Sequence, residues 1–160
     1  MILAIDPGNV ESAFVVVDDD LEKVISKGKV RNEELLEKID LEFTNLPIKY
    51  VAIEMIASYG MAVGKTVFDT CLWIGRFIDR VHQKLWKDAV LIYRMEEKMC
   101  LCHSSRAKDS NIRQALIDRF GVVGTKKEPG YFYGFKKDIW AAMAVAVAFH
   151  DNHYAKEADE

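Results

Sequence analysis

Three acidic residues stand at the edges of apolar segments that lie far apart in this 160-residue chain. Asp6 ends the apolar run 1–5, Glu54 ends the run 50–53, and Asp138 opens a long stretch rich in alanine and valine. A carboxylate is costly to bury alone, so segments of this kind indicate that the three acids meet and share a cation. Hard divalent ions such as Mg²⁺ prefer oxygen ligands. The pattern therefore predicts a metal site that only the tertiary fold assembles.

The order of predicted elements is typical of an α/β domain. Apolar runs and turn signals predict strands over 1–6, 12–18, 23–30, 50–54 and 89–93. Helical periodicity predicts helices over 32–41, capped by Asn32, and over 63–86, 110–120 and 138–151. A three-stranded meander followed by crossover units gives a mixed five-stranded sheet with helices on both faces. We expect one domain over 1–151, with Asp6 and Glu54 on neighbouring strands, and a polar tail over 152–160.

The long helix predicted over 63–86 is apolar on more than one side. A stripe steps by three and four residues from Val63 to Leu85, and Phe68, Leu72 and Trp73 widen it beyond a single face. A helix of this kind must bury two sides. We therefore expect a homodimer that uses this helix.

Charge and composition narrow the function classes. The net charge of −3 is unfavourable for nucleic-acid binding, but residues 94–137 hold ten Lys or Arg against five Asp or Glu. A local basic surface matters more for phosphate binding than the total charge. No apolar run reaches the roughly 18 residues that a membrane helix needs, and three cysteines form no disulfide framework. We expect a cytoplasmic protein that does not associate with a membrane.

Three short motifs together resemble the RuvC family of Holliday-junction resolvases, and most closely its phage-encoded branch. They are Ala-Ile-Asp-Pro-Gly at 4–8, Ala-Ile-Glu at 52–54, and Lys-Lys-Asp at 136–138 before the alanine-rich helix. The resemblance implies a ribonuclease-H-like fold and a homodimer that cuts four-way DNA junctions with Mg²⁺ or Mn²⁺. It also implies that Asp6, Glu54 and Asp138 are catalytic metal ligands, and that a phage-encoded protein would act in the host cytoplasm.

Such ligands imply a two-ion mechanism that needs no nucleophilic side chain. Two divalent ions about 3.5–4 Å apart would bind one scissile phosphate, one activating water and the other neutralising the leaving oxygen.

Position 141 departs from the family pattern. The family has an acid one helical turn after the position of Asp138, on the same helix face, and this chain has Ala141 there. Two interpretations stand. The chain is a catalytically disabled variant, or its lineage works with three acids or recruits Asp109, Asp118 or Asp151.

Several residues are candidates for DNA contact. They are Tyr59, Lys65, Arg106, Lys108, Arg113, Lys136 and Lys137. An aromatic such as Tyr59 stacks on an unpaired base or closes the edge of the core. The basic residues bind phosphate, helped by a helix N-terminus near 110, or form a solvated surface.

The sequence thus favours a Mg²⁺-dependent endodeoxyribonuclease, a crossover junction resolvase of DNA recombination, or its inactivated variant. The alternative is a non-catalytic protein that binds branched DNA. Actin-like sugar kinases also begin with a strand, an aspartate and a glycine turn, but they need two such domains.

Overall fold

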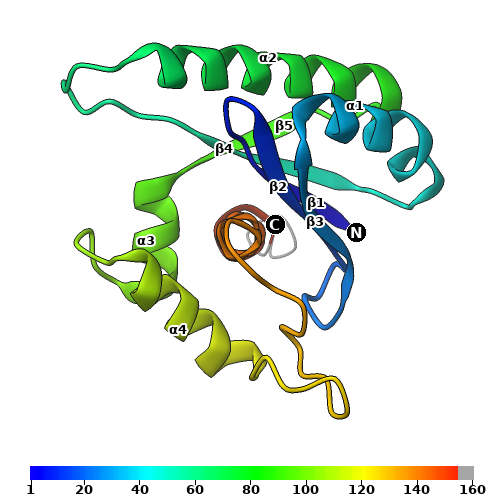
Figure 1. Ribbon diagram of the computed structural model, residues 1–160, viewed down its shortest axis with the longest axis vertical. Coiled ribbons are helices and arrows are strands. Elements are labelled where there is room, and N and C mark those ends of the chain that lie inside the picture. The colour runs from blue at the N-terminus through cyan, green and yellow to red at the C-terminus, as the bar shows by residue number, and fades with distance from the viewer. Residues whose placement is uncertain (155–160) are drawn as a thin grey trace.

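A five-stranded mixed sheet forms the centre of the molecule in the computed structural model, which describes residues 1–154 (Figure 1). The strands are β1 (Ile2–Asp6), β2 (Glu11–Val17), β3 (Val24–Arg31), β4 (Tyr50–Met55) and β5 (Ala89–Tyr93). Their order across the sheet is β3-β2-β1-β4-β5. β1 pairs antiparallel with β2, and β2 with β3, whereas β4 is parallel to both β1 and β5. The predicted mixed five-stranded sheet is confirmed.

Two helices cover one face of the sheet, α1 (Asn32–Leu41) and α2 (Lys65–Leu85), with a short 3₁₀ turn at Phe43–Asn45 (Figure 1). Alternate residues of β1 point to this side, where Leu3 and Ile5 meet Leu35 of α1 and Phe77 of α2 in one buried cluster. The period-2 alternation of a strand explains why each residue of β1 contributes to only one of two cores.

The helix α5 (Ile139–Phe149) packs on the opposite face of the sheet (Figure 1). All of its residues except Ala141 are buried, so its nearly uniform apolar sequence reflects contact on every side. A turn of π-helix, His150–Tyr154, follows it, and the Tyr154 ring lies 5.3 Å from the Tyr50 ring. Residues 155–160 of the predicted polar tail lie outside the described residues.

Two further helices, α3 (Arg94–Cys102) and α4 (Asp109–Phe120), complete this side of the molecule. α4 follows the sequence prediction and ends at Gly121, whose φ of 123° suits glycine. α3 was not predicted. Its only fully buried residue is an acid, Glu97, so it lacks the apolar stripe by which helices are recognised.

A buried hydrogen-bond network fixes the turn that follows Asp6. Asn32 is the first residue of α1 rather than its cap, and its Nδ2 donates to the Gly8 carbonyl at 2.9 Å. The Ser12 hydroxyl donates to Asn32 Oδ1 at 2.6 Å and accepts from the Gly8 N–H at 3.1 Å. A Cβ on Gly8 would lie 2.3 Å from the Glu11 carbonyl oxygen, so only glycine fits. The turn is thus rigid where the first acid leaves the sheet.

Candidate metal centre

Asp6 and Glu54 lie side by side at the carboxyl ends of two parallel strands. Ile5 of β1 pairs with Ile53 of β4, so the two acids follow at the next position of the register. Their side chains point to the same face of the sheet as those of Ala4 and Ala52, which is the face that α5 covers. Ligands of open α/β sheets commonly bind outside the carboxyl ends of the strands. The predicted adjacency of Asp6 and Glu54 is therefore present in the fold.

The environment of Asp6 disfavours its ionised form. Burial raises the pKa of Asp6 to about 9, and repulsion from Glu54 together with a hydrogen bond to Glu54 acts in the same direction. The charges of Asp138 and Glu97 add smaller contributions. Two adjacent carboxylates repel each other when both are ionised, and a nearby cation offsets that repulsion. Near neutral pH and without a cation, the pair therefore holds a proton.

Asp138 comes to the same region but is paired with a lysine. It is the N-cap residue of α5, and its carboxylate accepts a 2.5 Å hydrogen bond from Lys29 Nζ. Lys29 stands on β3 opposite Ala13, which in turn pairs with Asp6, so Lys29 and Asp6 share one row across the sheet. Hydrogen bonding to Asp138 raises the pKa of Lys29 despite partial burial. In this arrangement the Lys29 ammonium group neutralises the carboxylate of Asp138, whose side chain is 52% exposed.

The structure adds a fourth acid, Glu97, to this region. Its side chain is fully buried, and its Oε2 accepts a 2.5 Å hydrogen bond from Arg94, one helical turn earlier on α3. Its Oε1 has no hydrogen-bond partner among the described residues. Burial raises the pKa of Glu97 to about 8, followed by repulsion from Glu54, while Arg94 opposes both. The charge of Glu54 raises the pKa of Glu97, and the charge of Glu97 raises that of Asp6, so Glu97 lies near these two acids.

Sequence reasoning missed Glu97, although one signal was present. α3 begins directly after β5, a strand parallel to β4. Polar residues that follow a parallel strand emerge at the same edge of the sheet as Asp6 and Glu54. An Arg–Glu pair spaced i, i+3 at that position was therefore a candidate for the site.

Position 141 faces a small pocket of about 70 Å³. Ala141 lines it together with Arg94, Asp109 and Asp138, among other residues. Of the three proposed substitute acids, Asp109 is the one that lines this pocket. It also pairs with Arg94.

The other two substitute acids are engaged elsewhere. Asp151 accepts hydrogen bonds from Arg119 at 2.5 and 3.0 Å. Asp118 accepts one from Gln114 at 2.8 Å on the same helix. Neither lines the pocket beside Ala141.

The carboxylate oxygens suit a hard divalent cation, although they do not converge on one position. Asp6 and Glu54 form a like-charged pair, and Glu97 offers a buried oxygen without a partner. Within residues 1–154, no three His, Cys, Asp or Glu side chains are grouped closely enough to hold a metal ion. Mg²⁺ needs only one or two direct carboxylates because it keeps several waters. The Asp6–Glu54 pair alone meets that requirement.

Two of the predicted DNA-contacting residues border the acids. Arg113 and Lys137 line the small pocket with Asp138, and both also line an adjoining surface pocket of about 290 Å³. The Arg113 guanidinium lies 4.6 Å from the centre of the Trp140 ring, which holds it in place. Lys136 is exposed in the segment before α5.

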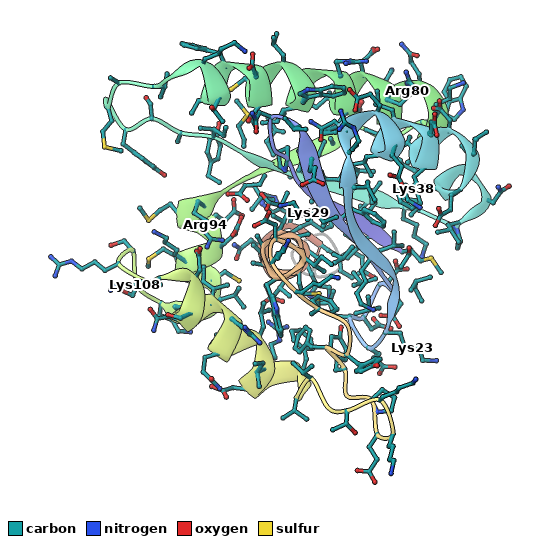
Figure 2. All side chains as sticks on the ribbon, viewed as in Figure 1. Lys23, Lys29, Lys38, Arg80, Arg94 and Lys108 are labelled. Carbon is teal, nitrogen blue, oxygen red and sulfur yellow. The ribbon has the colours of Figure 1, made fainter. Side chains whose placement is uncertain are left out.

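The basic partners of two acids also lie in this region. Figure 2 shows Lys29 on β3 and Arg94 at the start of α3, both near the end of α5 that faces the viewer. Basic side chains from β3 and α3 thus lie in the same region as the acids of the site.

The other candidates lie on loops and helix ends further along the surface. Arg106 and Lys108 are exposed in the segment that leads into α4, where Lys108 is the N-cap residue. Lys65 opens α2 and pairs with Asp69 at 2.5 Å. Tyr59 is 65% exposed in the loop between β4 and α2 and has a φ of 50°. An exposed aromatic on a loop is available for stacking but is not part of the acid cluster.

Comparison with known proteins identifies the fold. Neither a protein-family model nor a curated protein sequence matches this chain. Among solved structures, Thermus thermophilus RuvC matches with a TM-score of 0.68 and 16% identity, covering 98% of this chain and 96% of that one. T. thermophilus RuvC in complex with a Holliday junction substrate matches with a TM-score of 0.71 and 14% identity, covering 98% and 95%.

The chain has a RuvC-like fold. The ribonuclease-H-like architecture expected from the sequence is therefore confirmed, and the match covers nearly the whole length of both proteins. The matched structures are of Thermus RuvC, and they give no support to the expected phage-encoded branch.

None of the helices described over residues 1–154 is both long enough and apolar enough to span a membrane.

Proposed function

We propose that this protein is a metal-dependent endonuclease that cleaves branched DNA, with the Holliday junction as its substrate. The observation that carries the proposal is the pair of adjacent carboxylates, Asp6 and Glu54, at the carboxyl edge of a RuvC-like sheet. Basic side chains of Arg113 and Lys137 border the third acid, Asp138. Metal-dependent phosphodiester hydrolysis needs carboxylates that bind the metal ion, and basic side chains beside them can bind the phosphate.

Each group of residues has a separate role in the proposed reaction. Asp6 and Glu54, with Asp138, would hold a Mg²⁺ or Mn²⁺ ion. A bound divalent ion supplies Lewis acidity that polarises the scissile phosphate and lowers the pKa of water. Tyr59 stacks on an unpaired base at the branch point. The basic residues bind the neighbouring DNA phosphates; they are Arg113 and Lys137 beside the acids, and Arg106, Lys108 and Lys136 further out.

A second candidate function, binding of branched DNA without cleavage, is favoured by two features. Ala141 removes an acid from the face of α5 that carries Asp138, and Lys29 neutralises Asp138. Both features lower the negative charge available to a second ion. Loss of that ion slows hydrolysis but leaves phosphate contacts intact.

A cleavage assay separates these functions. A synthetic four-way junction and a linear duplex of equal length are incubated with the full chain in Mg²⁺, Mn²⁺ or EDTA, with Ala141→Asp and Asp6→Asn in parallel. The nuclease proposal expects metal-dependent cuts in the junction that Asp6→Asn abolishes. If the wild type is an impaired nuclease, the Ala141→Asp variant should cleave the junction faster than the wild type. Junction binding without cleavage by either wild type or Ala141→Asp supports the binding protein, and equal affinity for junction and duplex refutes both functions.

We also propose a homodimer through α2. Phe68 and Leu72 on this helix are 60% and 69% exposed, and Met61 in the preceding loop is 71% exposed. Exposed apolar side chains on one helix are typical of a subunit interface. Two copies joined in this way would present two acid sites to two arms of a junction.

The expected cytoplasmic location stays a prediction, as does the host cytoplasm if a phage encodes the protein.

A further inference from the structure

Glu97 is a buried acid that satisfies only half of its hydrogen-bonding capacity. Its side chain has no exposed surface, Arg94 binds Oε2, and Oε1 has no partner among the described residues. Buried polar atoms without partners are rare in native proteins. Leaving a charged oxygen in this state is costly. A group that binds Oε1 would remove the cost.

A purely structural role explains this arrangement poorly. A buried ion pair is often no more stable than an apolar pair of similar volume. Strong structural pairs also engage both oxygens of the carboxylate, commonly with a bidentate arginine. Arg94 instead divides its guanidinium between Glu97 and the exposed Asp109. The second oxygen of Glu97 is thereby left without a partner among the described residues.

The position of Glu97 relates it to the adjacent acids rather than to Asp138. Its strongest repulsive partner is Glu54, and its charge also acts on Asp6. It approaches from α3, at the carboxyl edge that β4 and β5 share. Asp138 approaches from α5 and is turned to Lys29 on β3.

The formal charges leave an excess of negative charge in this region. Asp6, Glu54 and Glu97 carry three negative charges when they are ionised, whereas Arg94 is shared between Glu97 and the exposed Asp109. Lys29 pairs with Asp138 and also lies 3.9 Å from Glu11. The acids therefore outnumber the two bases that pair with them, and a divalent cation would reduce the excess.

We propose that Glu97 completes the divalent-ion site that Asp6 and Glu54 begin, and so replaces the acid that is absent from position 141. The inference rests on the proposed nuclease function and names a ligand that family resemblance does not. Arg94 is a positioning residue that holds Oε2 so that Oε1 faces the ion or one of its waters. Because no three acids of residues 1–154 are grouped closely enough to ligate one ion directly, Glu97 acts through a water of the ion, as a carboxylate that α3 contributes in addition to Asp138 of α5.

Isothermal titration of Mn²⁺ into the full chain, without DNA, tests the proposal. The proteins are wild type, Glu97→Gln, Asp6→Asn and the control Glu96→Gln. Glu96 lies on the same helix but binds His153 at 2.7 Å and Asn152 at 3.2 Å. We expect Glu97→Gln to weaken Mn²⁺ binding roughly 10- to 100-fold, the range seen for groups that support a metal. Glu96→Gln should retain wild-type affinity.

Metal-free stability distinguishes a ligand from a structural residue. The amide of Glu97→Gln still accepts from Arg94, and the substitution removes a buried ionisable group. In EDTA this variant should therefore unfold at the same or higher urea concentration than wild type, and it should lose the stabilisation that Mn²⁺ gives to wild type. If Glu97→Gln does not fold, Glu97→Asp keeps the charge and should bind Mn²⁺ more weakly than wild type while remaining folded.

The outcomes separate this inference from the proposed function. Wild-type Mn²⁺ affinity in Glu97→Gln, with affinity lost in Asp6→Asn, overturns the role of Glu97 and leaves the nuclease proposal standing. Unchanged affinity in Asp6→Asn, or an absence of Mn²⁺ binding to wild type, overturns the metal centre itself.

Discussion

Removing divalent ions should make the stability of this protein fall as the pH rises from 6 to 8. The reason is the proton on Asp6, whose pKa is about 9 in the fold against an ordinary value of 3.8. Between those values the folded protein holds a proton that the unfolded chain has released. Folding then takes up a proton, so a higher pH favours the unfolded state. The contribution is fully present below pH 3.8 and is lost as the pH approaches 9.

The loss in the free energy of unfolding can be calculated for the range from pH 6 to pH 8. One pH unit corresponds to about 1.4 kcal/mol for each proton taken up, so Asp6 alone lowers the free energy of unfolding by about 2.7 kcal/mol over two units. Glu97, with a pKa of about 8, adds a smaller decline in the same direction. Hydrogen bonds from basic groups lower the pKa of Asp19 and, despite burial, that of Asp151. These two acids are therefore ionised in both states over this window and add no slope.

Urea denaturation in EDTA at pH 6, 7 and 8 measures this slope, with Asp6→Asn as the matched control. The introduced asparagine is neutral at every pH and can donate to Glu54 as a protonated Asp6 does. The slope of the variant should therefore be shallower by about 1.4 kcal/mol per pH unit, and at pH 8 the variant should be the more stable protein. Groups remote from Asp6 contribute equally to both proteins and cancel in the difference.

Added Mg²⁺ should reverse the trend in wild type. A cation favours the ionised carboxylates, so the stabilisation by Mg²⁺ should grow from pH 6 to pH 8. Equal slopes for wild type and Asp6→Asn in EDTA would refute the reasoning, because they would mean that Asp6 carries no proton in the folded protein.

Three further changes give independent tests. Lys29→Gln should strengthen Mg²⁺ binding by up to about fivefold in a calorimetric titration, since it frees Asp138 from a partly exposed ion pair worth about 0.2–1 kcal/mol; weaker binding would contradict this. Phe68→Asp should convert a dimer to a monomer in sedimentation velocity without a loss of thermal stability, and an unchanged sedimentation coefficient would exclude this face as the interface. Ser12→Ala should cost about 2–3 kcal/mol in urea denaturation, because it leaves buried partners including Asn32 unpaired, and a cost below about 0.5 kcal/mol would show that the network contributes little.

Local patterns were sufficient for most of the fold. The apolar runs of β1 and β4 and the periodicity of α2 are properties of neighbouring residues, and they predicted the mixed sheet that the structure has. The helix α3 was not predicted because its inward residue is Glu97 rather than an apolar side chain. Asn32 was interpreted as a helix cap because its residue type suits one, whereas its partners, Gly8 and Ser12, lie 24 and 20 residues away.

The sequence likewise predicted only some of the residues of the candidate site. Asp6, Glu54 and Asp138 were visible because each interrupts or borders an apolar segment, and a buried acid is costly in any fold. Sequence did not indicate that Lys29 would meet Asp138, 109 residues away, or that Glu97 would lie buried with one unpaired oxygen among the described residues. Apart from α3 and its buried acid, the sequence by itself determined which segments become strands and helices and which of them carry an acid, because those properties depend on residues within one turn or one strand. Only the tertiary structure decided which charges face one another, because that depends on register across the sheet and on how α3 and α5 pack against it.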